Sequence, residues 1–346
     1  MRPFRFALLF ALIVFVSLSA AAYEAVLLGD LHYDRAELHH KTLSEAKQRE
    51  QRRNVAYWAN RAPKVIAAAA AKINARTAFA MQLGDIVQGD TDAEEDQATL
   101  CREALGILKK HIAAVPLYFV KGNHDHRCPG GGAASERVIP PSFKSEKLIA
   151  GPNVNYAFLH ENDLFLCFDS EKPDLAWIKK VLAEHPDVRH TFVFTHLPVL
   201  PCSTRGIWWL IYNINPRTDA ARLELRKLLA ARDAIVICAH THKPSLMVYR
   251  SAEGRITQAV VSSMAISGAA AKWTLESDTF DTPALQKVLD ETPKIVAGVD
   301  EYRPGIVKCE RYQGSGFAVL RVEGEHVFLD CYAGTGSAPA ATWQLR

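Results

Sequence analysis

The sequence predicts an α/β protein folded as a layered sandwich, and three observations lead to this prediction. Five short apolar runs each end in a cluster of Gly, Asp or His, and helical patterns lie between them. Runs that are continuously apolar and rich in Val, Ile and Phe are typical of strands buried on both faces. Two further segments have the pattern of β-hairpins, so we expect antiparallel strands to be added to the parallel ones within the layers.

The predicted elements follow one another along most of the chain. The apolar runs that predict strands are residues 25–32, 78–85, 116–125, 190–198 and 234–242. The helical patterns are residues 43–74, 92–112, 175–185 and 220–232. The two antiparallel hairpins are residues 154–170 and 317–332. Surface loops are expected at residues 127–147, which are rich in Gly, Pro and Ser, and at residues 199–219, whereas residues 266–316 give no clear prediction.

The first 22 residues have the pattern of a secretory signal peptide. Two arginines precede an uncharged apolar stretch at residues 6–18, and Ala20 and Ala22 occupy the small-residue positions before a cleavage site. An uncleaved membrane anchor is the alternative, but the apolar stretch is shorter than the roughly 20 residues that a spanning helix needs. We therefore expect residues 1–22 to be removed and the protein to be exported to the periplasm or the extracellular space. Residues 23–346 would then form one domain without a membrane span.

The composition is that of an ordinary globular protein, with 346 residues of which 49% are hydrophobic and 23% charged. Loss of the signal peptide removes two arginines and no acid, so the formal net charge falls from +3 to +1 (39 basic against 38 acidic residues). The remaining charge is dispersed, without the Lys/Arg block that follows a nucleic-acid backbone. The charge pattern therefore argues against a nucleic-acid partner.

Seven cysteines leave an exported protein with at least one unpaired thiol. Cys167 and Cys238 lie within predicted strands and are expected to be buried thiols. The disulfide candidates, which lie in or near predicted loops, are Cys128, Cys202, Cys309 and Cys331. Their connectivity is left open, because spacing alone does not determine it.

Side chains with metal-ligand chemistry follow each of the five predicted strands. They are Asp30 and His32, Asp85, Asn123 and His124, His196, and His240 and His242. Any one of these alone would more often be a turn residue or a hydrogen-bonded histidine, but the carboxyl ends of parallel strands meet at one edge, where α/β sites form. A mixture of carboxylate, amide and imidazole suits Zn, Mn or Fe. For the densest cluster, VKGNHDHRC at residues 120–128, a metal site, an acid/base site and a polar turn all remain open.

Five short motifs carry a resemblance to a known family. They are GDLH (29–32), GD (84–85), GNHD (122–125), TH (195–196) and HTH (240–242). In order and spacing they resemble the five blocks of the calcineurin-like metallophosphoesterases, and the resemblance extends over residues 25–332. It implies two mixed β-sheets packed face to face and flanked by helices, with a binuclear metal centre at the carboxyl ends of the strands.

The resemblance also implies a role for each residue of the site. The metal ligands that it implies are Asp30, His32 and His242 for one ion, Asp85 as the bridge, and Asn123, His196 and His240 for the other. His124 is similar to the family's histidine that is not a ligand but contacts the phosphoryl oxygen and protonates the leaving alkoxide, a task that suits an imidazole near neutral pH. Asp125 could hold the ring of His124 in its working orientation or be a plain turn aspartate, and both interpretations stay open.

Three positions depart from the patterns of related groups. Ala239 stands where the last block usually begins with glycine. Gln88 stands three residues after Asp85, where purple acid phosphatases carry a tyrosine ligand, so we expect no tyrosinate colour. The arginine that protein phosphatases carry soon after the bridging aspartate is missing from Gln88-Gly89-Asp90, which argues against a phosphoprotein phosphatase.

The function that the resemblance implies is that of an exported metal-dependent phosphoesterase. A metal-bridging hydroxide would attack a small phosphodiester or phosphomonoester in line, with two divalent or trivalent ions of Zn, Mn or Fe as cofactors. Two alternatives use the same scaffold: a non-catalytic module that binds metal or phosphorylated ligands, and a secreted nuclease. The first is opposed by the fact that every ligand position is filled, and the second by the near-zero charge.

Two other groups of residues have an open role. Arg205, Trp208 and Trp209 lie in the predicted loop that follows His196, where they could overhang the site or simply pack the loop against the domain. His126 has no predicted role, and the pair at residues 39–40 is expected at the surface.

Overall fold

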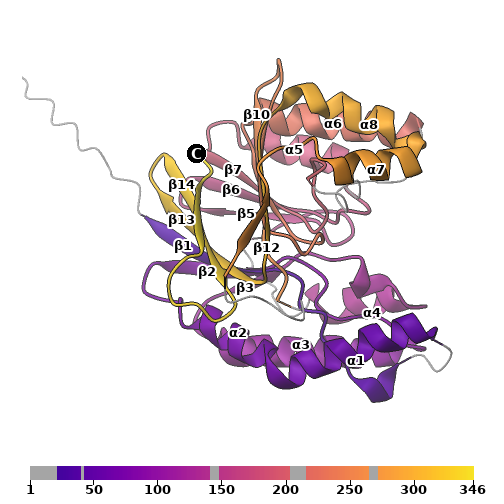
Figure 1. Cartoon of the computed structure of the whole chain (residues 1–346). Helices are drawn as coiled ribbons and strands as arrows, with labels where there is room; N and C mark the ends of the chain where they lie inside the picture. Colours follow the sequence, from indigo (N-terminus) through magenta and orange to yellow (C-terminus); the bar gives the residue numbers. More distant parts are fainter. Residues whose placement is uncertain (1–21, 40–42, 141–147, 203–215, 265–271) are drawn as a thin grey trace, which may run out of the picture.

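Two mixed β-sheets pack face to face at the centre of the molecule, and helices cover the outer face of each sheet (Figure 1). The computed structural model describes residues 22–39, 43–140, 148–202, 216–264 and 272–346. The arrangement confirms the predicted layered sandwich of two mixed sheets flanked by helices.

The first sheet has six strands in the order β15-β14-β13-β1-β2-β3. Their bounds are β1 (Tyr23–Leu28), β2 (Thr77–Gln82), β3 (Leu117–Phe119), β13 (Gly316–Glu323), β14 (His326–Ala333) and β15 (Ala341–Gln344). β1, β2 and β3 are parallel, whereas β13 pairs antiparallel with β1 and forms the predicted hairpin with β14. The chain segments that follow β1, β2 and β3 therefore leave the sheet at the same edge.

The second sheet has nine strands in the order β11-β12-β9-β10-β8-β7-β6-β5-β4. Their bounds are β4 (Ile149–Ala150), β5 (Tyr156–His160), β6 (Asp163–Cys167), β7 (His190–Phe194), β8 (Ile235–Cys238), β9 (Ser245–Arg250), β10 (Arg255–Val260), β11 (Thr274–Ser277) and β12 (Ile306–Gln313). β6, β7, β8 and β10 are parallel, and β5 with β6 forms the predicted antiparallel excursion.

The helices divide between the two outer faces (Figure 1). On the side of the six-stranded sheet lie α1 (Glu45–Asn60), α2 (Ala62–Ala70), α3 (Glu94–His111) and α4 (Gly131–Val138). On the side of the nine-stranded sheet lie α5 (Leu175–Glu184), α6 (Pro216–Ala231), α7 (Pro283–Glu291) and α8 (Val296–Tyr302). Single 3₁₀ turns are formed by Ala36–Leu38, His124–His126, Pro293–Ile295 and Arg303–Gly305. Ser44, Asp174 and Thr282 start α1, α5 and α7, because each side chain accepts a bond from a backbone N–H of the first turn.

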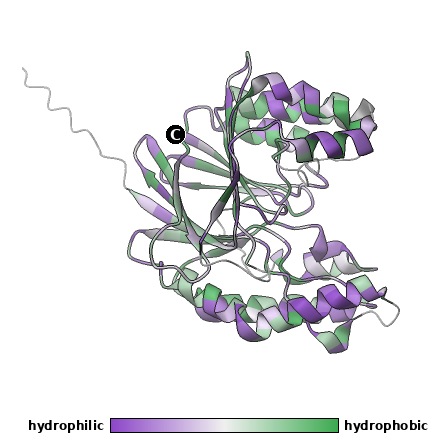
Figure 2. Ribbon diagram, in the orientation of Figure 1, coloured by the Kyte–Doolittle hydropathy of each residue, from purple (hydrophilic) through white to green (hydrophobic). Residues whose placement is uncertain are grey.

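Three apolar layers hold the sandwich together. The layer between the sheets contains Leu27 of the first sheet and Phe165 of the second. Val26 and Leu28, on either side of Leu27, instead face the helices α1–α3, because successive side chains of a strand point to opposite faces. A third layer joins the nine-stranded sheet to α5–α8. Figure 2 shows hydrophobic and hydrophilic residues side by side on the helices, as expected where one face is buried and the other meets solvent.

Some elements differ from the sequence predictions. The helical pattern at 43–74 is two helices, because the backbone leaves the helical region at Arg61 (φ −127°, ψ −49°) and a proline opens α2. The predicted loop at 127–147 contains α4, whose glycine-rich start hid the helix. Residues 266–316, for which no element was predicted, contain β11, α7, α8 and β12.

The disulfide candidates are corrected by the structure. All seven cysteines are free and buried, including Cys128, Cys202, Cys309 and Cys331. The loop assignment failed for two of them, since Cys309 lies in β12 and Cys331 in β14, where their side chains face the apolar layers. Cys167 and Cys238 are buried thiols as predicted.

Among the described residues, no helix combines the length and the apolar character needed to cross a membrane. Residues 1–21, which make up nearly all of the predicted signal peptide, lie outside the described part of the chain. The cleavage and export predictions therefore remain predictions.

Candidate metal centre

The seven predicted metal ligands lie together where the strands of both sheets end. They come from the loops after β1, β2 and β3 in one sheet and after β7 and β8 in the other. The ligands with a carboxylate or an imidazole form two groups. The first group is Asp30, His32, Asp85 and His242, and the second is Asp85, His196 and His240. Within each group the ligand atoms lie no more than 4.8 Å from one another, and Asp85 belongs to both.

Strained backbone places these side chains. A positive φ occurs at seven residues other than glycine in the described chain, and four of the seven are predicted ligands: His32 (51°), Asp85 (52°), His240 (67°) and His242 (58°). The left-handed conformation costs an L-residue about 1–2 kcal/mol, so a structure retains it where a function requires the geometry. The concentration of this strain at one edge of the sheets marks that edge as a functional site.

Glycines before the ligands let the loops approach closely. At Gly122, an added Cβ would lie 2.1 Å from the backbone nitrogen of Asp85. At Gly84, which has a φ of 93°, an added Cβ would lie 2.5 Å from Nδ1 of His196. Both contacts are far below a van der Waals distance, so only glycine fits. The two motif glycines are therefore explained by the close packing of three ligand loops.

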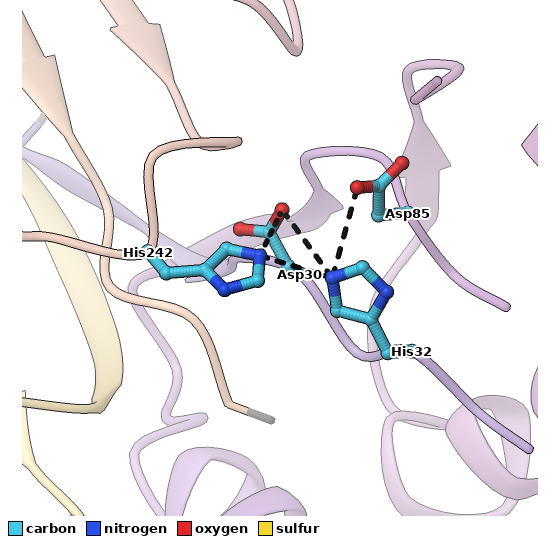
Figure 3. Close-up of side chains that lie close together, drawn as sticks. All are labelled: Asp30, His32, Asp85 and His242. Carbon is cyan, nitrogen blue, oxygen red and sulfur yellow. Dashed lines mark hydrogen bonds and ion pairs between the residues drawn. The ribbon is translucent and has the colours of Figure 1, made fainter. Parts of the chain in front are cut away.

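Four side chains of the first group point at a common centre (Figure 3). Nε2 of His242 lies 3.3 Å from Oδ1 of Asp30 and 3.0 Å from Nε2 of His32. Nε2 of His32 lies 3.7 Å from Oδ2 of Asp85 and 4.0 Å from Oδ1 of Asp30. Two carboxylates and two imidazoles at these separations can be the ligands of one divalent ion.

The second group surrounds the other side of the Asp85 carboxylate. Nε2 of His196 lies 3.2 Å from Oδ2 of Asp85 and 3.1 Å from Oδ1 of Asn123. Nδ1 of His240 lies 3.3 Å from the same Nε2. Nδ1 of His196 donates to the carbonyl oxygen of Leu83 at 2.7 Å, which fixes the ring and turns Nε2 toward the centre. This is the usual arrangement of a histidine that binds a metal through one nitrogen and a backbone carbonyl through the other.

The polar atoms of the centre are not satisfied by the protein alone. Oδ1 of Asp30 and Nδ1 of His32 are buried without a hydrogen-bond partner among the described residues. Burial lowers the pKa of His32 well below its ordinary value and lowers that of His240 to about 3, with His196 adding to the effect on His240. Both rings are therefore neutral and offer lone pairs, which a cation can accept.

The charges also favour a cation. Burial by itself would raise the pKa of both carboxyl groups, but His242 lowers that of Asp30 to about 2 and His196 lowers that of Asp85 strongly. In turn, burial opposes a charge on His196, while the adjacent Asp85 raises its pKa to about 10. Two buried carboxylates thus remain ionised, and a metal ion would displace the proton of His196 on binding. The residues present therefore fit a pair of divalent ions.

His124 lies beside the ligands without belonging to either group. Its backbone N–H donates to Oδ1 of Asp85 at 2.7 Å, and its ring packs edge-on against that of His32 with 4.5 Å between centroids. Nδ1 lies 2.6 Å from the carbonyl oxygen of Gln88 and must donate to it, because a carbonyl cannot donate. Nε2 is then the nitrogen left for a substrate. Burial lowers the pKa of His124.

Asp125 does not orient the ring of His124. Its two carboxylate oxygens accept from backbone N–H groups of Gly122 (2.8 Å), Asp85 (3.0 Å) and Ile86 (2.9 Å), with a longer contact from Val87. The partner of the His124 ring is instead the carbonyl oxygen of Gln88. Burial, followed by the charge of Asp85, raises the pKa of Asp125 to about 7. Asp125 therefore joins the loop of Asn123 to the loop of Asp85, which is more than a plain turn aspartate would do.

Several contacts near the site were not predicted. His126 pairs with Glu171 at 2.6 Å, and His39, whose side chain is 13% exposed, lies 2.6 Å from Oδ1 of Asp34. Arg127 lies against His124. Only the pair of His126 and Glu171 joins loops that are distant in the sequence, and no periodic pattern predicts any of the three contacts. Arg205, Trp208, Trp209 and His40 lie outside the described residues.

The profile of the calcineurin-like phosphoesterase family matches residues 25–244, which is more than half of the chain. The chain belongs to this family. The motifs of the sequence, the two mixed sheets and the paired donor groups agree with it. No curated protein matches the sequence at a significant level.

Solved structures share the fold at low sequence identity. A purple acid phosphatase, PPD1 from yellow lupin seeds, superposes with a TM-score of 0.58 over 94% of this chain at 12% identity, and the match covers 54% of the lupin protein. A structure of PhoD gives a TM-score of 0.55, again over 94% of this chain at 12% identity, and covers 69% of PhoD. The chain thus spans about half the length of the first of these proteins, and the likeness shows the fold alone.

Proposed function

We propose that this member of the family is an exported, metal-dependent phosphoesterase that hydrolyses a small phosphate ester. The observation that supports the proposal most strongly is the shared position of Asp85, whose carboxylate borders both donor groups. A single carboxylate with two coordinating oxygens is what a bridge between two metal ions requires. Two ions bound there would acidify a water molecule and neutralise the charge that develops on the phosphoryl group.

The protein's own residues would divide the remaining work. The backbone carbonyl oxygen of Gln88 holds Nδ1 of His124, so Nε2 is left for the substrate and, when the ring is protonated, would deliver that proton to the leaving oxygen of the ester. Asp85 fixes the backbone of His124 through the N–H bond at 2.7 Å. Asp125 in turn fixes the backbone of Asp85, so that the acid and the ligands keep one geometry.

Hydrolysis of two chromogenic esters tests this proposal. The purified protein, loaded with Mn²⁺ or Zn²⁺, should hydrolyse p-nitrophenyl phosphate or bis-p-nitrophenyl phosphate, and EDTA should abolish the reaction. His124→Ala should retain its metal and lose turnover by about 10²–10⁴-fold, most of all for esters with poor leaving groups. Metal-loaded protein that binds phosphorylated ligands but hydrolyses nothing in a broad ester panel would instead be the non-catalytic binding module. Nicking of supercoiled plasmid would identify a nuclease.

Export is a separate part of the proposal. It is supported by the pattern of residues 1–22 and by the start of β1 at Tyr23, directly after the expected cleavage site. Expression of the full chain in a bacterium with fractionation should give a mature protein outside the cytoplasm whose first residue is Tyr23, measured by mass spectrometry. A full-length protein that stays in the cytoplasm contradicts it.

A further inference from the structure

The guanidinium of Arg127 lies against the ring of His124. His124 is the first residue of the 3₁₀ turn His124–His126, and Arg127 directly follows this turn. Nη1 of Arg127 lies 3.1 Å from Nδ1 and 3.3 Å from Nε2 of His124. Because Nδ1 already donates to Gln88, the arginine shares the space next to Nε2, which is the nitrogen left for a substrate. Arg127 therefore places a permanent positive charge at the point where His124 would meet the leaving group.

A buried polar chain anchors Arg127 from behind. Its Nε lies 3.3 Å from Oδ1 of Asp90, whose side chain is only 7% exposed. Oδ2 of Asp90 accepts from the side-chain amide of Gln88 at 3.1 Å, and that amide accepts in turn from Asn54 at 2.7 Å. The side chain of Arg127 is 31% exposed. Asp90 thus holds Nε of Arg127, while Nη1 of the same guanidinium extends toward His124.

The position of Arg127 differs from that of an ordinary surface arginine in the same region. Arg137, on α4, is 52% exposed and pairs through Nη2 with Glu95 at 2.8 Å and with Glu94 at 3.7 Å. Both acids lie in the first turn of α3, and neither belongs to the donor groups. Arg137 thus offers a matched arginine whose loss should leave the site alone.

We propose that Arg127 binds the phosphoryl group of the substrate beside His124, and that it thereby favours phosphomonoesters over phosphodiesters. The inference rests on the proposed function and deepens it. A guanidinium binds phosphate oxygens through paired, charge-assisted N–H bonds. The phosphoryl group of a monoester carries up to two negative charges, whereas that of a diester carries one and has an alkyl or aryl group in place of one charged oxygen. A fixed third cation next to the metal ligands therefore suits the monoester.

Three variants test the proposal: Arg127→Met, Arg127→Lys and the control Arg137→Met. The measurements are kcat and KM for p-nitrophenyl phosphate and bis-p-nitrophenyl phosphate, metal content, and the Kd of inorganic phosphate by calorimetry. Arg127→Met should raise the Kd of phosphate and lower kcat/KM for the monoester by about 10–150-fold, which is what loss of a hydrogen bond to a charged group costs. The diester should change by less than about threefold. Arg127→Lys keeps the charge without the paired N–H groups and should fall between.

Arg137→Met should behave as the unsubstituted protein in every measurement. An unchanged phosphate Kd and an unchanged ratio of monoester to diester hydrolysis in Arg127→Met overturn the inference, and the proposed function then still stands if the unsubstituted protein hydrolyses either ester. Hydrolysis of neither ester by the unsubstituted protein defeats the proposed function, while the phosphate Kd still decides the role of Arg127. If Arg127→Met loses metal or fails to fold, Arg127→Lys decides in its place: an unchanged phosphate Kd overturns the inference.

Discussion

Two fully buried aspartates at opposite ends of strands have very different surroundings. Asp163, the first residue of β6, accepts from the hydroxyl of Tyr23 at 2.6 Å, from Nε and Nη2 of Arg189 at 3.0 and 2.5 Å, and from a backbone N–H. Asp30, after the carboxyl end of β1, has one oxygen without a hydrogen-bond partner among the described residues. Nε2 of His242 lies 3.3 Å from that oxygen.

The contrast separates a structural carboxylate from a ligand. A buried charge is stable when donors and a counter-charge surround it, and Asp163 has both. Asp30 and Asp85 instead lie among imidazoles, and burial lowers the pKa of two of these, His32 and His240. Because Oδ1 of Asp30 has no hydrogen-bond donor among the described residues, a bound cation would stabilise it. Substitution of the metal-centre aspartates should therefore lower metal content and activity, whereas substitution of Asp163 should lower stability.

The largest effect is expected at the shared ligand. Asp85→Asn removes the charge that both donor groups use, so the variant should lose metal and at least about 10²-fold in activity. Metal content by mass spectrometry and ester hydrolysis on the same sample measure both. Retention of metal and activity by Asp85→Asn would mean that Asp85 is no bridge.

Asp163→Asn should give the reverse result. Arg189, whose side chain is 7% exposed, would lose its buried partner, which costs about 3–5 kcal/mol of unfolding free energy in urea. Metal content and activity of the folded fraction should be unchanged. Asp300→Asn is the control. Asp300 pairs with Arg303 at the surface and is half-exposed, so its substitution should change stability little. Loss of metal in Asp163→Asn would show that Asp163 and the metal centre are not independent.

Asp125→Asn lies between these cases, because Asp125 is fully satisfied like Asp163 yet supports the ligand loops. An amide NH₂ in place of one oxygen would face backbone N–H groups, at a cost of about 1–3 kcal/mol. Because the backbone of Asp85 would shift with it, metal affinity should fall by about 10–100-fold. Urea unfolding and metal titration separate the two effects. An unchanged metal affinity at lowered stability would place Asp125 wholly with the structural group.

The smallest effect is expected for the partly exposed pair of His126 and Glu171. The hydrogen bond to Glu171 raises the pKa of His126, although burial opposes it. Because the folded-state pKa is the higher one, the pair stabilises the protein fully below the unfolded pKa of about 6.5, and this stabilisation is lost as the pH rises through the folded pKa. Both side chains are about a quarter exposed, so Glu171→Gln should cost less than about 1 kcal/mol at acidic pH and less again in base. A cost that grows with pH contradicts this assignment.

The ligand positions could be predicted from the sequence because each is a local feature. A ligand one or two residues beyond an apolar strand is visible in a window of ten residues, and the order of five such windows carries the family resemblance. The two mixed sheets followed from the same resemblance. Strand pairing itself is not local, and so the edge strand β11 and its neighbour β12 were missed.

The partners of Asp125 and His124 could not be predicted for the same reason. Asp125 binds N–H groups about 40 residues earlier in the chain, and the carbonyl oxygen that holds His124 belongs to Gln88, whose side chain was the only part that the motif comparison considered. Almost every residue has the same backbone N–H and C=O groups, so a sequence does not show which of them will form a given hydrogen bond. The buried Cys309 illustrates the same limit, since it lies in β12, in a region for which no strand was predicted.

Asp85 should stand between two metal ions, and anomalous X-ray scattering from crystals equilibrated with Mn²⁺ or Zn²⁺ would locate them. We expect two anomalous peaks per chain, each about 2.0–2.2 Å from a carboxylate oxygen of Asp85. The remaining ligands of the two ions should be Asp30, His32 and His242 on one side and Asn123, His196 and His240 on the other. No peak at Asp85, or a single peak there at saturating metal, would contradict the binuclear centre.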